Sequence, residues 1–512
     1  MDDLNRREFL TAVGASAGTA SAMQPSARRR PNILFVLCDN LNPNVLGCAG
    51  HPLVKTPNLD RLASQGTYFT NCYCASPVCV PARAGLFSGM FPSDVDSFCN
   101  ATPFQGQRPT WGTALRSAGY YTKATGKMDL TGHADLGFDQ QLTAHAHDTG
   151  GGDLTALFRR PLCYRLHERE DIEGRVLRHE HQDQPVLHTA LEFLRGDVPK
   201  RSEPWLLYVG YIGPLPGFQV EPAYARMYPP DQVTPAQVPP GYFETIPEPW
   251  EATRCYKRIA TPIPQDRVRR ALSAYYGNVT AMDARVGQIM SELDRSGLRR
   301  NTIVIFSSDH GRSLGEHGLW YHNEPTDHSS RVPLIVAGPG IPAGKRIDAP
   351  TMHVDLFPTL AAWGGASLPS GLRGHSLLPL LEDRLGEHPD YAYSELHAEG
   401  TCTGSFVIRR GKWKYIHYTY YASLLFNMEE DPGEMKDVIA TPEGKRVSKE
   451  LHQILTSLVD PTERTERAFA AQEKKLQDLC ARMTLDELLD YGFERRLGRG
   501  QALTLLKKYK KS

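Results

Sequence analysis

The stretch CVPARAGLFSG at residues 79–89 reads as a loop that runs into a helix. Pro81 suits the first helical turn, because its missing N–H would have no partner there anyway. Cys79 would then lie where free backbone N–H groups and the helix dipole favour an anion. Arg83 follows about one turn later, so its guanidinium can reach the same anion. The local pattern fits an anion site and a buried structural cysteine beside a surface arginine equally well.

Apolar runs on either side of this stretch predict buried parallel strands. They cover residues 31–38 (PNILFVLC), 205–211 (WLLYVGY) and 302–308 (TIVIFSS). Asp39 and Asn40 follow the first run, and Asp309 and His310 follow the last. Ligands of open α/β sheets gather outside the carboxyl ends of the strands. We therefore expect a metal site at this edge, with ordinary polar strand ends as the alternative.

Helical periodicity and a change in composition complete the outline. Apolar residues recur every three or four positions from 264 to 298, which predicts one long helix. The proline-dense residues 214–264 read as a long wrapping loop, residues 406–416 as a hairpin and residues 446–495 as helical. These patterns predict an α/β domain over 31–375 and a smaller C-terminal α+β domain over 385–512.

Overall composition excludes some classes of function. The formal net charge of the 512 residues is zero, which argues against partnership with nucleic acid or an anionic membrane surface. Ten cysteines are too few for a disulfide scaffold, and their spacing assigns no bridge.

The N-terminal segment predicts export. Residues 1–27 hold a twin arginine (NRREFL, residues 5–10), a short small-residue stretch and an Ala-Ser-Ala site at 20–22. The stretch is too short and too weakly apolar to span a membrane. We expect a periplasmic or secreted protein that leaves by the twin-arginine route.

Residues 79–89 resemble the signature C-x-P-x-R-x-x-L-x-[TS]-G of type I sulfatases. Two further segments resemble the same family, residues 119–130 and residues 424–434, so that the likeness runs from residue 31 to about residue 440. The tail after residue 446 is similar to the choline-sulfatase branch, in which it helps oligomers form. The resemblance implies an alkaline-phosphatase-like fold, with a large mixed, mostly parallel sheet between helices.

In that family the cysteine is converted to formylglycine by a maturation enzyme, and the aldehyde hydrate attacks the sulfate ester. Carried over to this chain, the nucleophile would derive from Cys79, with Arg83 and Lys127 as cations around the sulfate. The resemblance also implies one divalent cation, usually calcium. Its ligands would be the following residues: Asp39, Asn40, Asp309 and His310. The family more often has Asp at position 40, so Asn40 predicts weaker metal binding.

Three further positions depart from the family. Asp129 stands where a histidine usually helps the sulfated intermediate to collapse, and a carboxylate can also act as a base. Leu215 replaces the usual histidine that protonates the leaving group, and His322 replaces a lysine. Since an imidazole titrates near neutral pH, we hypothesise that His322 supplies the missing acid. A surface loop histidine is the alternative.

The leading interpretation is an exported sulfatase that acts on a sulfated small molecule or glycan, and it leaves homo-oligomers open. A second interpretation is a phosphonate or phosphate ester hydrolase of the same superfamily. A third is a degenerate scaffold that binds sulfated glycans, which the changes at Asn40, Asp129 and Leu215 would explain. The intact residues Cys79 and Lys127 weigh against the third.

Overall fold

The computed structural model describes residues 30–130, 134–142, 157, 164–165, 167–178, 181–215 and 217–510. Contacts group residues 31–512 into one compact unit. The predicted export segment, residues 1–27, lies outside the described residues. The division into domains over 31–375 and 385–512 stays a prediction.

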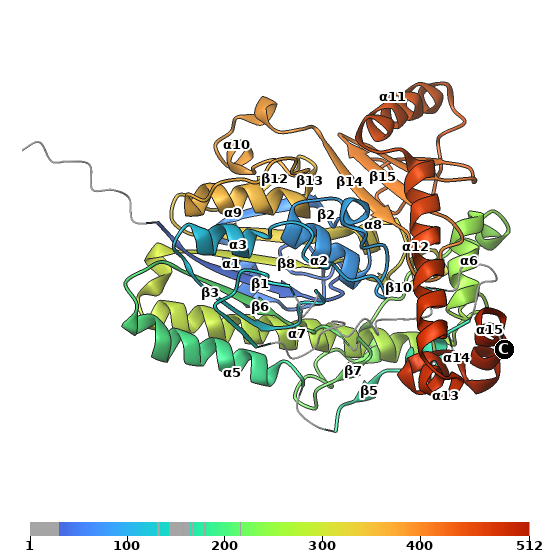
Figure 1. The fold of residues 1–512 in the computed structure, drawn as a ribbon, viewed down its shortest axis with the longest axis horizontal. Coiled ribbons are helices and arrows are strands. Elements are labelled where there is room, and N and C mark those ends of the chain that lie inside the picture. Colours follow the sequence, from blue (N-terminus) through green and yellow to red (C-terminus); the bar gives the residue numbers. More distant parts are fainter. Residues whose placement is uncertain are drawn as a thin grey trace, which may run out of the picture. The chain divides into compact units, whose positions relative to one another are not determined.

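A nine-stranded sheet organises this unit (Figure 1). Its strand order is β12-β2-β11-β8-β1-β6-β3-β4, with β13 beside β2. The strands are β1 (Asn32–Cys38), β2 (Thr67–Tyr73), β3 (Tyr121–Gly126), β4 (Gln140–Leu142), β6 (Trp205–Gly210), β8 (Thr302–Ser308), β11 (Arg331–Ala337), β12 (Lys345–Ile347) and β13 (Thr351–Met352). Only β11 runs antiparallel to its neighbours in the described sheet. The predicted mixed, mostly parallel sheet is therefore confirmed.

Helices cover both faces of the sheet, because the central strands are apolar on both sides. Leu34 and Val36 of β1 pack into one core, and Ile33 and Phe35 into the other. The first core holds α1 (Pro57–Ser64), α5 (Gln184–Glu192) and the long α7 (Gln265–Arg295). The second core holds α2 (Cys79–Ser88), α3 (Trp111–Ser117) and α9 (Leu356–Gly364). In Figure 1, α5 and α7 lie on one side of the strands and α3 and α9 on the other.

A smaller antiparallel sheet follows in the chain. It is made of β14 (Tyr391–Leu396), β15 (Ser405–Arg410), β16 (Trp413–Tyr418) and β17 (Leu424–Asn427). The hairpin predicted at 406–416 is β15–β16, and it turns at Gly411, whose φ is 50°. The helical tail is α11 (Pro442–Leu458), α12 (Pro461–Arg482), α13 (Leu485–Leu488), α14 (Glu494–Leu497) and α15 (Arg499–Tyr509).

The prediction of an uninterrupted loop over residues 214–264 is wrong. The segment contains α6 (Glu248–Tyr256) and the short strand β7 (Gln219–Val220), which pairs with β5 (Arg175–Val176). The prolines near the start of α6 misled the prediction: Pro247 is its N-cap and Pro249 lies in its first turn, where proline is tolerated.

Two further findings bear on the sequence predictions. The cysteines that the structure describes are all free thiols. Within the described residues, no helix is both long enough and apolar enough for a membrane span.

Candidate active site

The polar residues predicted at the sheet edge do lie together. Asp39 and Asn40 follow β1, and Asp309 and His310 follow the adjacent parallel strand β8. Cys79 is the first residue of α2, as the position of Pro81 predicted. Each of these side chains is at most 5% exposed. A buried cluster of ionisable groups has thus been built from segments far apart in the sequence.

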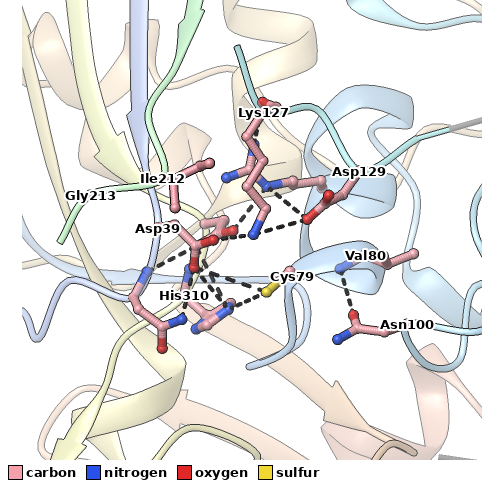
Figure 2. Close-up of polar contacts among 12 residues, drawn as sticks. Asp39, Cys79, Val80, Asn100, Lys127, Asp129, Ile212, Gly213 and His310 are labelled. Atoms are coloured by element: carbon pink, nitrogen blue, oxygen red, sulfur yellow. Dashed lines mark hydrogen bonds and ion pairs between the residues drawn. The ribbon is translucent and has the colours of Figure 1, made fainter. Parts of the chain in front are cut away.

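The thiol of Cys79 faces this cluster (Figure 2). Its Sγ lies 3.2 Å from Nε2 of His310 and 3.9 Å from Oδ1 of Asp39. Nε2 of His310 is in turn 3.8 Å from Oδ1 of Asp39 and 3.7 Å from Oδ1 of Asp309. Potential ligand atoms of these four side chains all lie within 4.8 Å of one another. The spacing is short enough for them to share one ion or one bound ligand.

Arg83 and Lys127 supply positive charge to the cluster. Nε of Arg83 donates to Oδ2 of Asp309 at 2.9 Å, and Nη1 donates to the carbonyl oxygen of Lys127 at 2.7 Å. Nη2 of Arg83 is buried without a hydrogen-bond partner among the described residues. The Lys127 ammonium lies between Asp39 and Asp129, 3.0 Å from Oδ2 of Asp129 (Figure 2). Arg83 therefore holds Asp309 and the backbone of Lys127 in place, and its Nη2 remains available for the anion that the sequence predicted.

Asn40 and Asp129 adopt left-handed backbone conformations, with φ of 62° and 54°. Asn and Asp tolerate this region better than other non-glycine residues, but it is uncommon and clusters at functional sites. The amide of Asn40 is fixed in its orientation, because Nδ2 donates to Oδ1 of Asp39 at 2.8 Å. Its Oδ1 therefore faces His322.

His322 lies at the cluster and not on an isolated surface loop. Its Nδ1 is 3.0 Å from Oδ1 of Asn40, and its ring centroid is 4.4 Å from that of His310. Since Oδ1 of Asn40 is an acceptor, a neutral His322 carries its proton on Nδ1. Burial, followed by the positive charges of His310 and Lys257, holds the pKa of His322 well below its ordinary value.

Burial also suppresses ionisation of the thiol. Desolvation and the negative charge of Asp39 raise the pKa of Cys79 well above its ordinary value. A neutral thiol is a poor nucleophile, so an unmodified Cys79 is not primed to attack an ester.

The two buried carboxylates of the cluster repel each other, and a bound cation would reduce this repulsion. Burial and the negative charge of Asp309 raise the pKa of Asp39. Burial also opposes ionisation of Asp309, but the positive charges of His310 and Arg83 outweigh it and lower the pKa of Asp309. Two carboxylates, the amide of Asn40 and an imidazole make a donor set in which oxygen predominates, which suits a hard divalent cation such as Ca²⁺. The residues present fit a metal ion of this kind.

Several site-forming residues carried no signal in the sequence. Lys257, with no exposed surface, donates from Nζ to the carbonyl oxygens of Trp320 (2.7 Å) and His322, and thus holds the His322 loop. Asp183 accepts from the backbone N–H groups of Ile212 and Gly213, both at 2.8 Å. Lys257 lies in the segment that the sequence predicts as a loop, and no pattern in the sequence singles out Asp183.

The loop at Leu215, which in the resembling family carries the leaving-group acid, is held by His181 from an earlier segment of the chain. Nε2 of His181 lies 2.8 Å from the carbonyl oxygen of Leu215. Asp183 lies 3.3 Å from the same imidazole. Leu215 itself has no group that can donate a proton, so this departure from the family pattern stands.

Residues 31–366 match the family model described as Sulfatase. The chain belongs to the sulfatase family. Residues 315–460 also match a model described as the C-terminal part of N-sulphoglucosamine sulphohydrolase. The family and its curated relatives make the chain a sulfuric ester hydrolase.

Curated relatives agree with the family match. A choline-sulfatase from Rhizobium meliloti (strain 1021) is 31% identical over 431 residues, which covers 81% of this chain and 83% of the relative. Arylsulfatase K from Homo sapiens is 28% identical over 475 residues, which covers 88% of this chain and 86% of the relative.

Solved structures share the fold of this sulfatase. A phosphonate monoester hydrolase of Agrobacterium radiobacter has a TM-score of 0.68 at 25% identity, and the match covers 84% of this chain and 95% of that one. A 2-O GAG sulfatase has a TM-score of 0.66 at 25% identity, with 84% and 92% covered. The predicted alkaline-phosphatase-like architecture is confirmed.

Proposed function

We propose that this sulfatase hydrolyses sulfate esters of a sulfated carbohydrate, with a formylglycine at position 79 and one divalent cation, calcium. The observation that carries the proposal is the buried group of Asp39, Cys79, Asp309 and His310, whose ligand atoms lie within 4.8 Å of one another. This group lies at the ligand-binding edge of an α/β sheet.

The high pKa of the Cys79 thiol supports the formylglycine proposal. An unmodified thiol in this surrounding stays protonated, whereas a hydrated aldehyde supplies an oxygen nucleophile. Cys79 would therefore serve as the precursor of the reactive group. A formylglycine-generating enzyme is the partner that this chemistry requires.

The cation would be held by Asp39, Asn40, Asp309 and His310. When bound, it supplies positive charge next to the sulfate oxygens and stabilises their negative charge. Arg83 keeps the Asp309 carboxylate in place through its 2.9 Å hydrogen bond. The buried Nη2 of Arg83 and the ammonium of Lys127 can bind sulfate oxygens directly.

Asp129 and His322 take the two proton-transfer roles in this proposal. Asp129, 3.0 Å from Nζ of Lys127, acts as a base when the sulfate is released. His322 protonates the leaving alcohol from Nε2, since Nδ1 faces Asn40. This role requires the doubly protonated ring, which the negative charge of a bound sulfate ester favours.

Export and the class of substrate rest on separate observations. The twin arginine in residues 5–10 supports passage to the periplasm or the exterior. The match to the C-terminal model of N-sulphoglucosamine sulphohydrolase and the likeness to a 2-O GAG sulfatase support a sulfated sugar as substrate.

Intact-mass analysis of the tryptic peptide that spans residue 79 tests the central proposal. The protein should be produced together with a formylglycine-generating enzyme, and a Cys79→Ala variant serves as the matched control. We expect a mass in which an aldehyde replaces the CH₂SH group, together with turnover of 4-nitrophenyl sulfate. An active enzyme whose peptide keeps an intact thiol would contradict the proposal.

Hydrolysis of phosphonate monoesters is the second candidate. It is favoured by the likeness to a phosphonate monoester hydrolase at a TM-score of 0.68. Comparing kcat/KM for 4-nitrophenyl sulfate and for 4-nitrophenyl phenylphosphonate separates the two. The sulfatase proposal requires the sulfate to be the better substrate.

A further inference from the structure

Arg312 is a buried cation that the proposed reaction does not use. It comes two residues after His310, and its side chain has no exposed surface. None of its three guanidinium nitrogens has a hydrogen-bond partner among the described residues. Burying an unpaired charge is costly, and proteins normally pair such a group. The arrangement is typical of a cation that is completed by a ligand.

The neighbouring cations do have carboxylate partners. Arg165 pairs with Glu168, and Nζ of Lys257 lies 3.8 Å from Oε1 of Glu324. For Arg312, the described residues provide no carboxylate within ion-pair distance. This part of the site therefore holds a guanidinium in excess of its acidic neighbours.

Aromatic rings hold the Arg312 guanidinium in place. Its central carbon lies 4.6 Å from the ring centroid of Phe218, 4.9 Å from that of Tyr321 and 5.6 Å from that of Tyr275. The backbone is held as well, because Nδ2 of Asn42 donates to the Arg312 carbonyl at 2.7 Å. Stacking fixes a guanidinium without using its N–H groups, so the donors remain available.

The guanidinium lies next to the segments that carry Leu215 and His322. A side chain at Gly217, two residues after Leu215, would overlap Nη2 of Arg312. Tyr321, whose ring centroid lies 4.9 Å from the guanidinium carbon, directly precedes His322. Positions 215 and 322 are the two that bear on the leaving group in the proposed function.

We propose that Arg312 binds a second anionic group, a carboxylate or a sulfate, on the alcohol part of the substrate. The inference rests on the proposed function and narrows its substrates to sulfate esters of acidic or multiply sulfated sugars. Because Arg312 has no exposed atoms, an incoming anion must displace a neighbouring side chain. Of the three aromatic residues, Tyr321 is the partly exposed one, and it is the one that would move.

Paired aryl sulfates test this subsite. The first pair is 4-carboxyphenyl sulfate and its neutral analogue 4-carbamoylphenyl sulfate, and 1,4-phenylene disulfate tests a second sulfate. In Arg312→Met, the ratio of kcat/KM for the anionic ester to that for the neutral ester should fall about tenfold or more, mainly through KM. Arg312→Lys should keep part of the ratio, because it retains the charge but not the planar fork.

Arg285→Met is the matched control. Arg285 of α7 is also a buried arginine, but it pairs with Glu221 and is none of the residues to which the proposed function gives a role. We expect this control to keep the substrate ratio and to lower the melting temperature, because it leaves Glu221 unpaired. Arg312→Met should melt no lower than the wild type, because it removes a charge that has no partner.

The outcomes separate the two proposals. A lower ratio for the carboxylate ester, the disulfate or both supports the subsite and identifies its anion. An unchanged ratio for both, in an active enzyme, overturns the subsite alone, and a lower melting temperature of Arg312→Met would then mark a structural cation. A wild type that hydrolyses none of the sulfates overturns the proposed function, and the subsite proposal with it.

Discussion

At the scale of one residue, Asn40 offers a test of the proposed cation site. In the proposed donor set with Asp39 and Asp309, it contributes a neutral amide where the family more often has a carboxylate. We expect Asn40→Asp to bind Ca²⁺ about tenfold more tightly, because ligand charge raises calcium affinity. Without calcium the same variant should be less stable, since a third carboxylate joins the buried cluster. Calorimetric titration of the protein with calcium measures both effects when combined with thermal unfolding.

Asn44→Asp is the control for that substitution. Asn44 is exposed, and its substitution adds the same charge four residues after Asn40. An equal change of affinity in both variants, or none in Asn40→Asp, would remove Asn40 from the proposed ligands.

The role of His322 can be separated from metal binding by varying the leaving group. A general acid helps a poor leaving group far more than a good one, and its contribution is about 10²–10⁴ in rate. We therefore expect His322→Ala to lose most activity on an alkyl sulfate and much less on 4-nitrophenyl sulfate. The slope of log(kcat/KM) against the pKa of the leaving alcohol should become steeper. Equal losses across the series would refute the acid role.

The ends of β3 and β6 place Lys127, and glycine makes their approach possible. Gly126 and Gly210 are paired across the two strands. A Cβ on Gly210 would lie 2.0 Å from the carbonyl oxygen of Lys127, an oxygen that also accepts from Arg83 and Tyr208. No side chain fits here without moving the backbone that carries the ammonium.

We predict that Gly210→Ala unfolds more easily by about 1–3 kcal/mol. Its kcat/KM should fall by more than about tenfold, because small displacements of charged site groups are costly in rate. Gly196→Ala is the control, since a Cβ there meets nothing within 4 Å. Urea unfolding and turnover of 4-nitrophenyl sulfate check both variants. A Gly210→Ala enzyme as stable and active as Gly196→Ala would show that the strand ends tolerate movement.

Elements with strong local patterns were predictable from the sequence, and those defined by distant contacts were not. β1, β8 and α7 were found because an apolar run or a helical repeat marks each of them. β2 was missed because its pairing partner β11 lies far along the chain, and β14 because its residues mix apolar and polar types without a clear alternation. The same limit applies to the site: Cys79 belongs to a motif, whereas Lys257 and Arg312 stand in no recognisable pattern.

At the scale of the whole molecule, Glu395 of β14 joins the smaller sheet to the segment after α2. Its carboxylate accepts from the backbone N–H of Ser93 at 2.6 Å and from the hydroxyls of Ser93 and Tyr393 at 2.9 and 2.7 Å. Burial opposes ionisation of Glu395, but hydrogen bonds from His397, Tyr393 and Ser93 outweigh it and lower its pKa from 4.5 to about 2. The contact therefore depends on a charged carboxylate.

A lowered pKa in the folded state stabilises the fold above the unfolded pKa of 4.5 and loses that contribution as the pH falls toward 2. We expect Glu395→Gln to lower the free energy of unfolding by about 1–3 kcal/mol at pH 7. The difference from wild type should shrink at pH 3. Glu430→Gln, at an exposed position, is the control. A constant difference at both pH values would contradict the role of the charge.

All ten residues of α2 are buried, and Cys79 is only 5% exposed. A modifying enzyme has to bind the backbone around its target, and this backbone is inaccessible once α2 is packed into the folded protein. Any conversion of the thiol must therefore take place on the unfolded chain, before α2 packs into the folded protein. If activity requires formylglycine, as proposed, then chains that fold before the conversion would stay unmodified, and the yield of active enzyme would depend on when the conversion occurs.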